Sequence, residues 1–224
     1  RFDASPVKVG RFTIRDSHAM GPTLNAVETL IHSSNTTSAR IADEMGPERL
    51  RQYMIDLGMN GRPEIELPAK GFPLWPGDKW ARLTNMTVGF GHGIAVTPLH
   101  LASAYAAMVN GGVYRPATLK KLGQGQAPKG RRVFKASTSS RMRQMMRAIA
   151  IYGTGRNADA PGYRVGGKTG SAEKPGGKGG YRRTALVSTF AAAFPMDRPR
   201  YVVIAMLDEP KGTLASSYQR TAAW

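Results

Sequence analysis

The sequence of 224 residues contains no cysteine. This absence excludes disulfide frameworks, thiolate zinc sites and cysteine nucleophiles, although a domain with an adequate core needs no disulfides to work outside the cytoplasm. Long hydrophobic runs are also missing, because the longest mostly apolar stretches, residues 186–196 and 202–207, are too short to cross a bilayer. Any membrane anchor is therefore expected outside these residues.

Acidic residues are scarce, with 15 Asp and Glu against 32 Lys and Arg, which gives a formal net charge of +17. Such an excess attracts polyanions, including nucleic acids and anionic lipid surfaces. The basic residues are scattered, however, and form no tract of five or more, and neither zinc-finger spacing nor an RNA-binding aromatic signature is present. We therefore predict that nucleic acid is not a partner. The composition, 41% hydrophobic and 21% charged, is typical of a globular domain.

Apolar residues recur at helical spacing through the first two thirds of the chain. This pattern predicts helices near residues 24–31, 37–45, 47–57, 98–110 and 137–152. Alternation around a glycine predicts one strand over residues 8–14, and Asp16 and Ser17 are expected to cap the helix that follows Pro22. The stretch 61–80, rich in proline and glycine, predicts an ordered loop.

The last third changes character. Three strand-like runs cover residues 163–172, 185–194 and 201–207, separated by short polar turns. The Lys- and Gly-rich tract 174–178 is short enough to be a hairpin loop, so an antiparallel arrangement is expected. Helices first and a sheet last predict one domain of the α+β class.

Two short motifs carry chemistry. The first, Ser33-Ser34-Asn35, lies at a break between two helical patterns, and the second, Lys168-Thr169-Gly170, lies on a predicted strand. Alone, the first is typical of a helix cap or turn and the second of a solvated strand edge. In this order and about 130 residues apart, they match the Ser-x-x-Lys, Ser-x-Asn and Lys-Thr-Gly set of serine acyl-transfer enzymes that recognise penicillin.

The residue types suit acyl transfer. The Ser33 hydroxyl and the Asn35 amide, on a link between helices, can face a cleft from one side. Lys168, on the facing edge strand, adds positive charge that lowers the cost of a serine alkoxide or of a nearby proton transfer.

The strand itself can bind a substrate. The Thr169 hydroxyl can hold a substrate carboxylate, and Gly170 has no side chain, so an acyl donor can lie along the strand edge. The backbone N–H of Ser171 is then free to donate into an oxyanion hole.

Further landmarks occur in a fixed order around these motifs. They are residues 31–36, 39–42, 45–46, 89–93, 96–99, 104–106, 153–155 and 166–172. With them the chain resembles the class B penicillin-binding proteins, and specifically their cell-division (septal) peptidoglycan transpeptidases. In the elongation-type relatives the second motif more often ends in Asp than in the Asn found at position 35.

The resemblance implies a fold, an activity and partners. The fold is that of the penicillin-recognising serine transpeptidases (β-lactamase-like), an antiparallel sheet packed by helices. The activity is a D,D-transpeptidase that attacks the D-Ala-D-Ala end of a peptidoglycan stem peptide, releases D-Ala and passes the acyl group to a neighbouring amine. Stem peptides and β-lactams are the implied ligands, no cofactor is implied, and other division proteins are the implied partners. The implied location is the periplasmic side of the bacterial inner membrane.

The resemblance also implies roles for individual residues. Ser33 is the expected proton shuttle and Asn35 the ligand of the substrate amide. Lys168 tunes the electrostatics, the pair Thr169-Gly170 holds the donor carboxylate, and Ser171 contributes mainly its backbone.

The nucleophile departs from the family pattern. The stretch Ser5-Pro6-Val7-Lys8 fits Ser-x-x-Lys, but a strand pattern follows it, so Ser5 and Lys8 are not expected to share a helix face. A second match begins at Ser171, on the edge strand. We therefore expect the nucleophile helix and the membrane anchor to lie outside the chain.

The 224 residues are accordingly expected to form an incomplete transpeptidase domain, inactive alone. Residues 1–160 make a mostly helical part with the first motif, residues 161–210 make the strands with the second, and the chain stops at Trp224, at the entry to the family's last helix.

Two alternatives remain open. One is a D,D-carboxypeptidase or a serine β-lactamase relative, although no loop with a deacylating Glu is evident and residues 89–105 favour the transpeptidase. The other is a non-catalytic, penicillin-binding-like assembly module, which would also lack Ser-x-x-Lys.

Overall fold

The fold is described from a computed structural model, which describes residues 1–68, 70–176 and 180–211. Its helices are α1 (Ala26–His32), α2 (Asn35–Met45), α3 (Pro47–Asp56), α4 (Arg82–Val88), α5 (Pro98–Val109), α6 (Ala136–Tyr152) and the 3₁₀ turn η1 (Arg156–Ala158). Its main strands are β7 (Gly166–Pro175), β8 (Tyr181–Phe194) and β9 (Tyr201–Asp208). Short pairs join β1 (Phe2–Asp3) with β4 (Thr23–Leu24), β2 (Val7–Val9) with β3 (Phe12–Ile14), and β5 (Val113–Tyr114) with β6 (Arg131–Arg132).

Local sequence explains where several helices begin. Thr97 caps α5 by accepting a hydrogen bond from the backbone N–H of His100, and Pro98 occupies the first turn, where its missing N–H costs nothing. The expectation that Asp16 and Ser17 cap the helix after Pro22 is wrong. Asn25 caps α1 instead, in a reciprocal capping box with Glu28.

Two further expectations need correction. Residues 8–14 do not form one strand, because Gly10 adopts a left-handed conformation (φ 56°) and turns the chain back, so that β2 and β3 pair as a hairpin. Helix α4 was not predicted, and it follows the stretch 61–80 that was expected as a loop. Its N-cap residue, Ala81, gives no side-chain cap and the helix contains β-branched residues, so its local signals are weak.

The expected antiparallel sheet is present in the order β7-β8-β9. Strand β7 begins at Gly166 and β8 at Tyr181, so the first strand starts later and the second earlier than the pattern predicts. The predicted hairpin tract 174–178 joins these two strands, but residues 177–179 lie outside the described part of the chain, as does the expected helix entry near Trp224.

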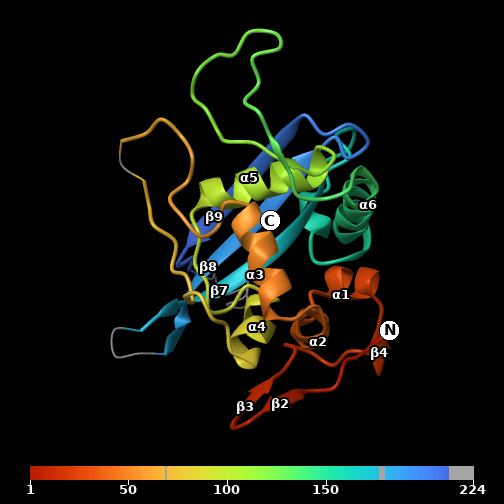
Figure 1. Cartoon of the computed structure of the whole chain (residues 1–224). Helices are drawn as coiled ribbons and strands as arrows, with labels where there is room; N and C mark the ends of the chain where they lie inside the picture. The colour runs from red at the N-terminus through yellow and green to blue at the C-terminus, as the bar shows by residue number, and fades with distance from the viewer. Residues whose placement is uncertain (69, 177–179, 212–224) are drawn as a thin grey trace.

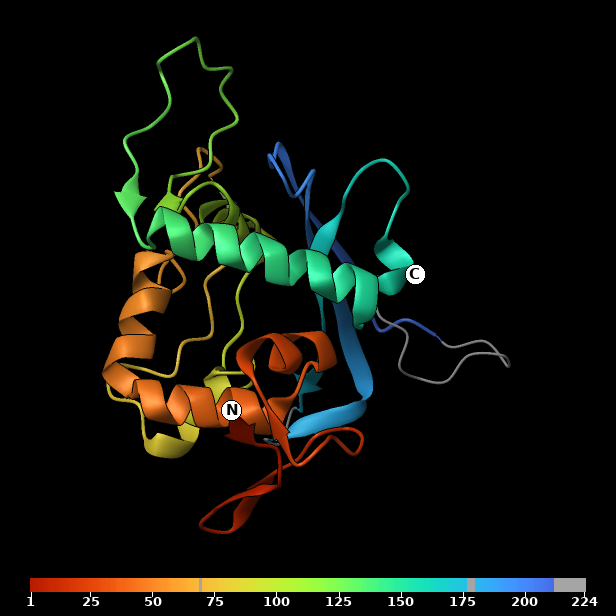
Figure 2. The same cartoon turned by 90° about the vertical axis from the view of Figure 1, so that its right-hand side faces the viewer.

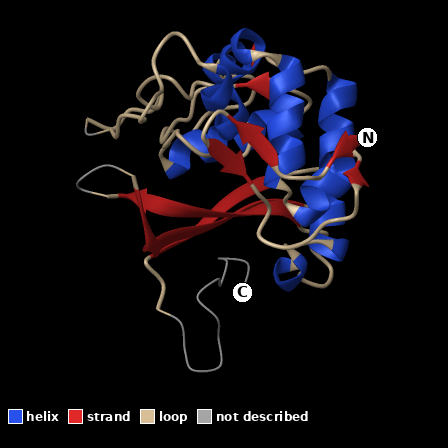
Figure 3. Ribbon diagram, turned by 90° about the horizontal axis from the view of Figure 1, so that it is seen from below, coloured by secondary structure: helices blue, strands red, loops and turns tan. Residues whose placement is uncertain are grey.

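Helices cover one face of the sheet. Val109 of α5 and Met146 of α6 form a buried cluster with Ala193 of β8 and with Met196. Figure 1 shows α5 lying across the strands, and Figure 3 shows most of the helices gathered on one side of the sheet. The fold is thus α+β, with helices packed on an antiparallel sheet.

The two edges of the sheet differ. Among the described residues no strand pairs with the outer edge of β9, which exposes Tyr201, Val203, Met206 and Leu207. The outer edge of β7 instead faces the helical part of the chain. Helix α6 contacts both α1 and β7, and Figure 2 shows it spanning the molecule above α1 and α2. This arrangement places the two motifs near one another.

Candidate active site

The structure brings Ser33 and Lys168 into direct contact. The Nζ atom of Lys168 donates a hydrogen bond to Ser33 Oγ at 2.6 Å and another to the carbonyl oxygen of Thr169 at 2.8 Å. Ser33 comes from the end of α1 and Lys168 from the edge strand β7, 135 positions later in the sequence. A hydroxyl and an amine from two distant segments of the chain therefore form a proton-transfer pair.

The link between α1 and α2 exposes the Ser33 hydroxyl. Ser33 itself adopts the left-handed conformation (φ 56°), which costs a non-glycine residue about 1 kcal/mol and ends α1 at once. The next residue, Ser34, is buried and caps α2 by accepting a hydrogen bond from the backbone N–H of Thr37. Because two helices meet here with so short a link, Ser33 is presented at their junction.

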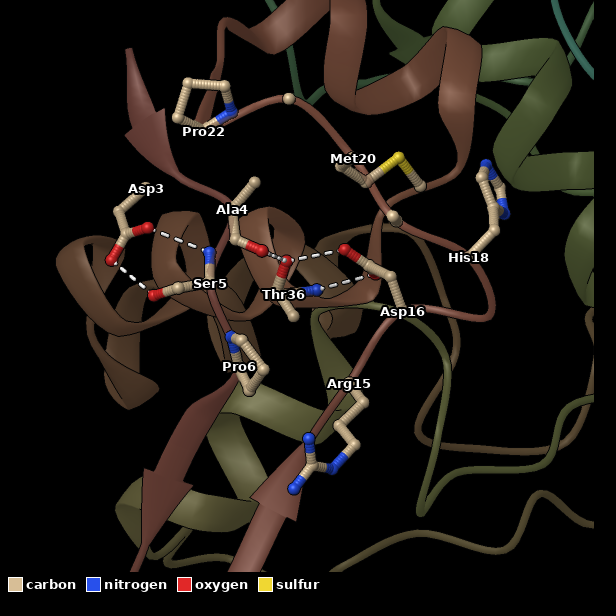
Figure 4. A pocket seen from close by; sticks show the side chains of 12 residues that line it. Asp3, Ala4, Ser5, Pro6, Arg15, Asp16, His18, Met20, Pro22 and Thr36 are labelled. Atoms are coloured by element: carbon tan, nitrogen blue, oxygen red, sulfur yellow. Dashed lines mark hydrogen bonds between the residues drawn. The ribbon is translucent and has the colours of Figure 1, made fainter.

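Asp16 stabilises this link by hydrogen bonds, a role that was not predicted from the sequence. Its carboxylate accepts hydrogen bonds from the Ser34 hydroxyl at 2.9 Å, the Thr36 hydroxyl at 2.7 Å, the Thr36 N–H at 3.1 Å and the backbone N–H of Asn35. Figure 4 shows the bonds between Asp16 and Thr36. A carboxylate beside the N-terminus of α2 also interacts favourably with the helix dipole.

Burial changes the chemistry of Lys168. Loss of hydration lowers the pKa of its ammonium group from 10.5 to about 8. The described part of the chain gives Lys168 no carboxylate partner that would oppose this effect. Near pH 8 a charged form that donates to Ser33 and a neutral form that can accept a proton from it are both populated.

The remaining strand residues differ in exposure. Thr169 is only 7% exposed, and its Oγ1 lies 2.6 Å from Oγ1 of Thr154, in the turn after α6. A Cβ atom built on Gly170 would meet no atom within 4 Å, so open space borders the strand at that position. Ser171 is exposed and lies opposite Ser188 of β8.

Asn35 is placed next to this pair but not in contact with it. It is the first residue of α2, two positions after Ser33, and is partly exposed. In the described structure its Nδ2 donates a hydrogen bond to the carbonyl oxygen of Arg15 at 3.4 Å, which is a long contact. The side-chain amide of Asn35 is therefore held only loosely beside Ser33.

The first Ser-x-x-Lys match has no helix. Ser5 lies between β1 and β2, its hydroxyl donates to Asp3 at 2.7 Å, and Lys8 belongs to β2. Ser5 borders a pocket of about 540 Å³ (Figure 4). This pocket is lined by residues of the first segment and Thr36, and none of the six expected site residues lines it. The prediction that Ser5 and Lys8 do not share a helix face is confirmed.

Fold and site together define the class of protein: a transpeptidase-type α+β domain whose helices pack on one face of an antiparallel sheet. The sequence matches the family described as the penicillin binding protein transpeptidase domain over residues 2–223. The chain belongs to this family, as its motifs and landmarks predicted.

Individual relatives agree. The probable peptidoglycan D,D-transpeptidase FtsI of Caulobacter vibrioides is 44% identical over all of the chain, which covers 39% of that relative. The probable peptidoglycan D,D-transpeptidase PenA of Neisseria gonorrhoeae is 32% identical over 94% of the chain and 36% of its own length. The chain thus spans less than half the length of these two relatives.

Solved structures share the fold. The transpeptidase domain of penicillin-binding protein 3 from Burkholderia pseudomallei superposes with a TM-score of 0.87 at 31% identity, over 93% of this chain and 64% of that one. Penicillin-binding protein 3 from Mycobacterium tuberculosis, in complex with aztreonam, gives a TM-score of 0.86 at 29% identity, over 97% of this chain and 53% of that one. The expected transpeptidase fold is confirmed, and the chain covers part of it.

Proposed function

We propose that the protein to which this chain belongs is a D,D-transpeptidase that cross-links peptidoglycan stem peptides through an acyl-serine intermediate during septal wall synthesis. The observation that supports this most directly is the hydrogen bond between Lys168 and Ser33, which joins the two motifs. Family membership and the names of the relatives point the same way.

In the proposed reaction a serine nucleophile attacks the carbonyl of the D-Ala–D-Ala bond. An acyl-serine forms, the C–N bond breaks, and D-Ala leaves with a proton on its amine. Ser33 passes that proton, because its hydroxyl is bonded to Lys168, an amine whose lowered pKa makes proton exchange easy near neutral pH. In the second half the amine of another stem peptide attacks the acyl-serine, and the nucleophile recovers its proton.

The donor peptide lies along the outer edge of β7 in this proposal. The open space at Gly170 admits its backbone, Thr169 with Gly170 binds its carboxylate, and the backbone N–H of Ser171 stabilises the oxyanion. Asn35 binds the amide of the substrate from the helical side, where its side chain is only loosely held.

We propose that neither Ser5 nor Ser171 is the nucleophile. Ser5 is outside any helix, and Ser171 lies on β7, so neither shares a helix face with a lysine three positions on. The nucleophile then belongs to a Ser-x-x-Lys outside the 224 residues, and the chain alone has no transpeptidase activity.

Fluorescent penicillin labelling followed by peptide mapping tests this proposal. We expect no adduct on the 224-residue chain and a slowly released adduct on the full-length protein, at a serine outside these residues. An adduct on Ser5 of the short chain would overturn the assignment of the nucleophile. Rapid release of the adduct would indicate a β-lactamase, and no labelling of the full-length protein would refute the function.

The β-lactam ligands and the location are also proposals. Penicillin-binding protein 3 of Mycobacterium tuberculosis has been solved in complex with aztreonam and with ampicillin, and we propose that this protein is acylated by the same class of compound. No helix in the described part of the chain is long and apolar enough to cross a membrane. We propose that an anchor elsewhere in the protein holds this domain on the periplasmic side of the inner membrane, among other division proteins. A fusion to a reporter enzyme active only outside the cytoplasm would be inactive if this location is wrong.

A further inference from the structure

The turn Gly153–Gly155, between α6 and η1, lies beside β7, because its Thr154 is hydrogen-bonded to Thr169. Gly153 lies against the end of α1, since a Cβ atom built on it would come within 2.6 Å of the carbonyl oxygen of Ile31. Gly155 lies against β8, since its Cβ would be 3.2 Å from the ring of Phe190. The turn is therefore packed between α1 and β8.

Thr154 is the one residue with a side chain in this turn. The residue is exposed, yet its Oγ1 lies 2.6 Å from Oγ1 of Thr169, which is almost fully buried. Because both neighbouring glycines are packed against backbone or ring atoms, the turn has little freedom to move Thr154 away. Thr154 is consequently held against the hydroxyl that the proposed function assigns to the donor carboxylate.

The direction of this hydrogen bond matters for binding an anion. A hydroxyl has one hydrogen to donate and two lone pairs that accept. If Thr169 donates to Thr154, no hydrogen remains on Thr169 for a carboxylate. If Thr154 donates, the Thr169 hydrogen is free, and the anion then favours this second arrangement.

We propose that Thr154 is a positioning residue that donates a hydrogen bond to Thr169 and so directs the Thr169 hydrogen to the carboxylate of the donor peptide. Thr154 acts through Thr169 and not on the reacting bond. The inference rests on the proposed function, because it takes the D-Ala-D-Ala carboxylate as the group that lies at Thr169.

Binding of two matched peptides to the 224-residue chain tests the role. One probe is an N-acylated peptide ending in D-Ala-D-Ala with a free carboxylate, and the other is its C-terminal amide. The amide resonances of Gly170 and Ser171 report binding in NMR titrations. We expect Thr154→Val to weaken binding of the carboxylate peptide about fivefold, the effect of losing one neutral hydrogen bond, because the Thr169 hydroxyl is then no longer oriented by a donor. Binding of the amide peptide should be unchanged.

Two further variants complete the test. Thr154→Ser keeps the donor and should bind the carboxylate peptide as the unmodified chain does. It replaces Thr154→Val as the informative variant if Thr154→Val reduces the melting temperature. Thr118→Val removes a comparable hydroxyl, which is bonded to Glu66 outside the two motifs, and should leave the binding of both peptides unchanged. If Thr154→Val weakens binding of both peptides equally, or weakens neither, the role of Thr154 is wrong while the proposed function still stands. If the unmodified chain binds neither peptide, the same titrations are made on the full-length protein, and failure there as well counts against the proposed function and the inference together.

Discussion

The partly buried Lys168 should make the stability of the protein depend on pH in a particular direction. Its pKa is about 8 in the folded chain and 10.5 in an unfolded one. Below pH 8 both states carry the proton, and the folded state bears the full cost of burying the charge. Between about 8 and 10.5 the unfolded state binds more protons, so the free energy of unfolding must rise with pH.

The size of the effect follows from the same two values. At about 1.4 kcal/mol for each pH unit, the gap between 10.5 and about 8 corresponds to about 3 kcal/mol. Replacing the amine in Lys168→Met removes the titrating group together with the hydrogen bond to Ser33. The loss of that bond shifts the stability of the variant by a similar amount at every pH. The cost of burying a charge, which the variant does not bear, exists in the unmodified chain only at pH values where its amine is charged.

Urea unfolding at several pH values between 7 and 10.5 measures this difference. We expect the stability of the unmodified chain, relative to Lys168→Met, to increase by about 3 kcal/mol across the range. Lys129 is an exposed lysine, and Lys129→Met is the matched control, for which the difference should be nearly flat. Parallel curves for the unmodified chain and Lys168→Met would refute the claim that burial depresses the pKa.

Two other substitutions separate stability from ligand binding. Gly170→Ala should leave the melting temperature unchanged, because its Cβ meets no protein atom. It should weaken acylation of the full-length protein by fluorescent penicillin at least tenfold, because the methyl group fills the space of the donor. Gly167→Ala is the contrasting variant, since its Cβ would overlap β8 and should destabilise the fold. Asp16→Asn should reduce the free energy of unfolding by about 1–2 kcal/mol, because it removes the charge and one of the acceptors at the start of α2. Unchanged urea unfolding of Asp16→Asn would show that Ser34 alone is a sufficient cap.

Signals that lie within a few residues of one another were predictable from the sequence. Thr97 with Pro98 starts α5, and the three strand-like runs form β7, β8 and β9, because caps and strand signals act between neighbours along the chain. The order and spacing of Ser33-Ser34-Asn35 and Lys168-Thr169-Gly170 predicted a serine enzyme that recognises penicillin, and the resemblance carried by the further landmarks predicted the family.

Only the tertiary structure decided how these parts meet. The contact of Lys168 with Ser33 spans 135 positions, and the depressed pKa of Lys168 arises from burial that no local pattern reveals. Asp16 was expected to cap the next helix but binds the one after it, because its partners are set by the packing of β3 against α2. Thr154 contacts Thr169 because α6 packs against β7 and the turn that follows α6 lies beside that strand. Motif residues can thus be found from local chemistry, whereas the residues that orient them are chosen by contacts that exist only once the chain has folded.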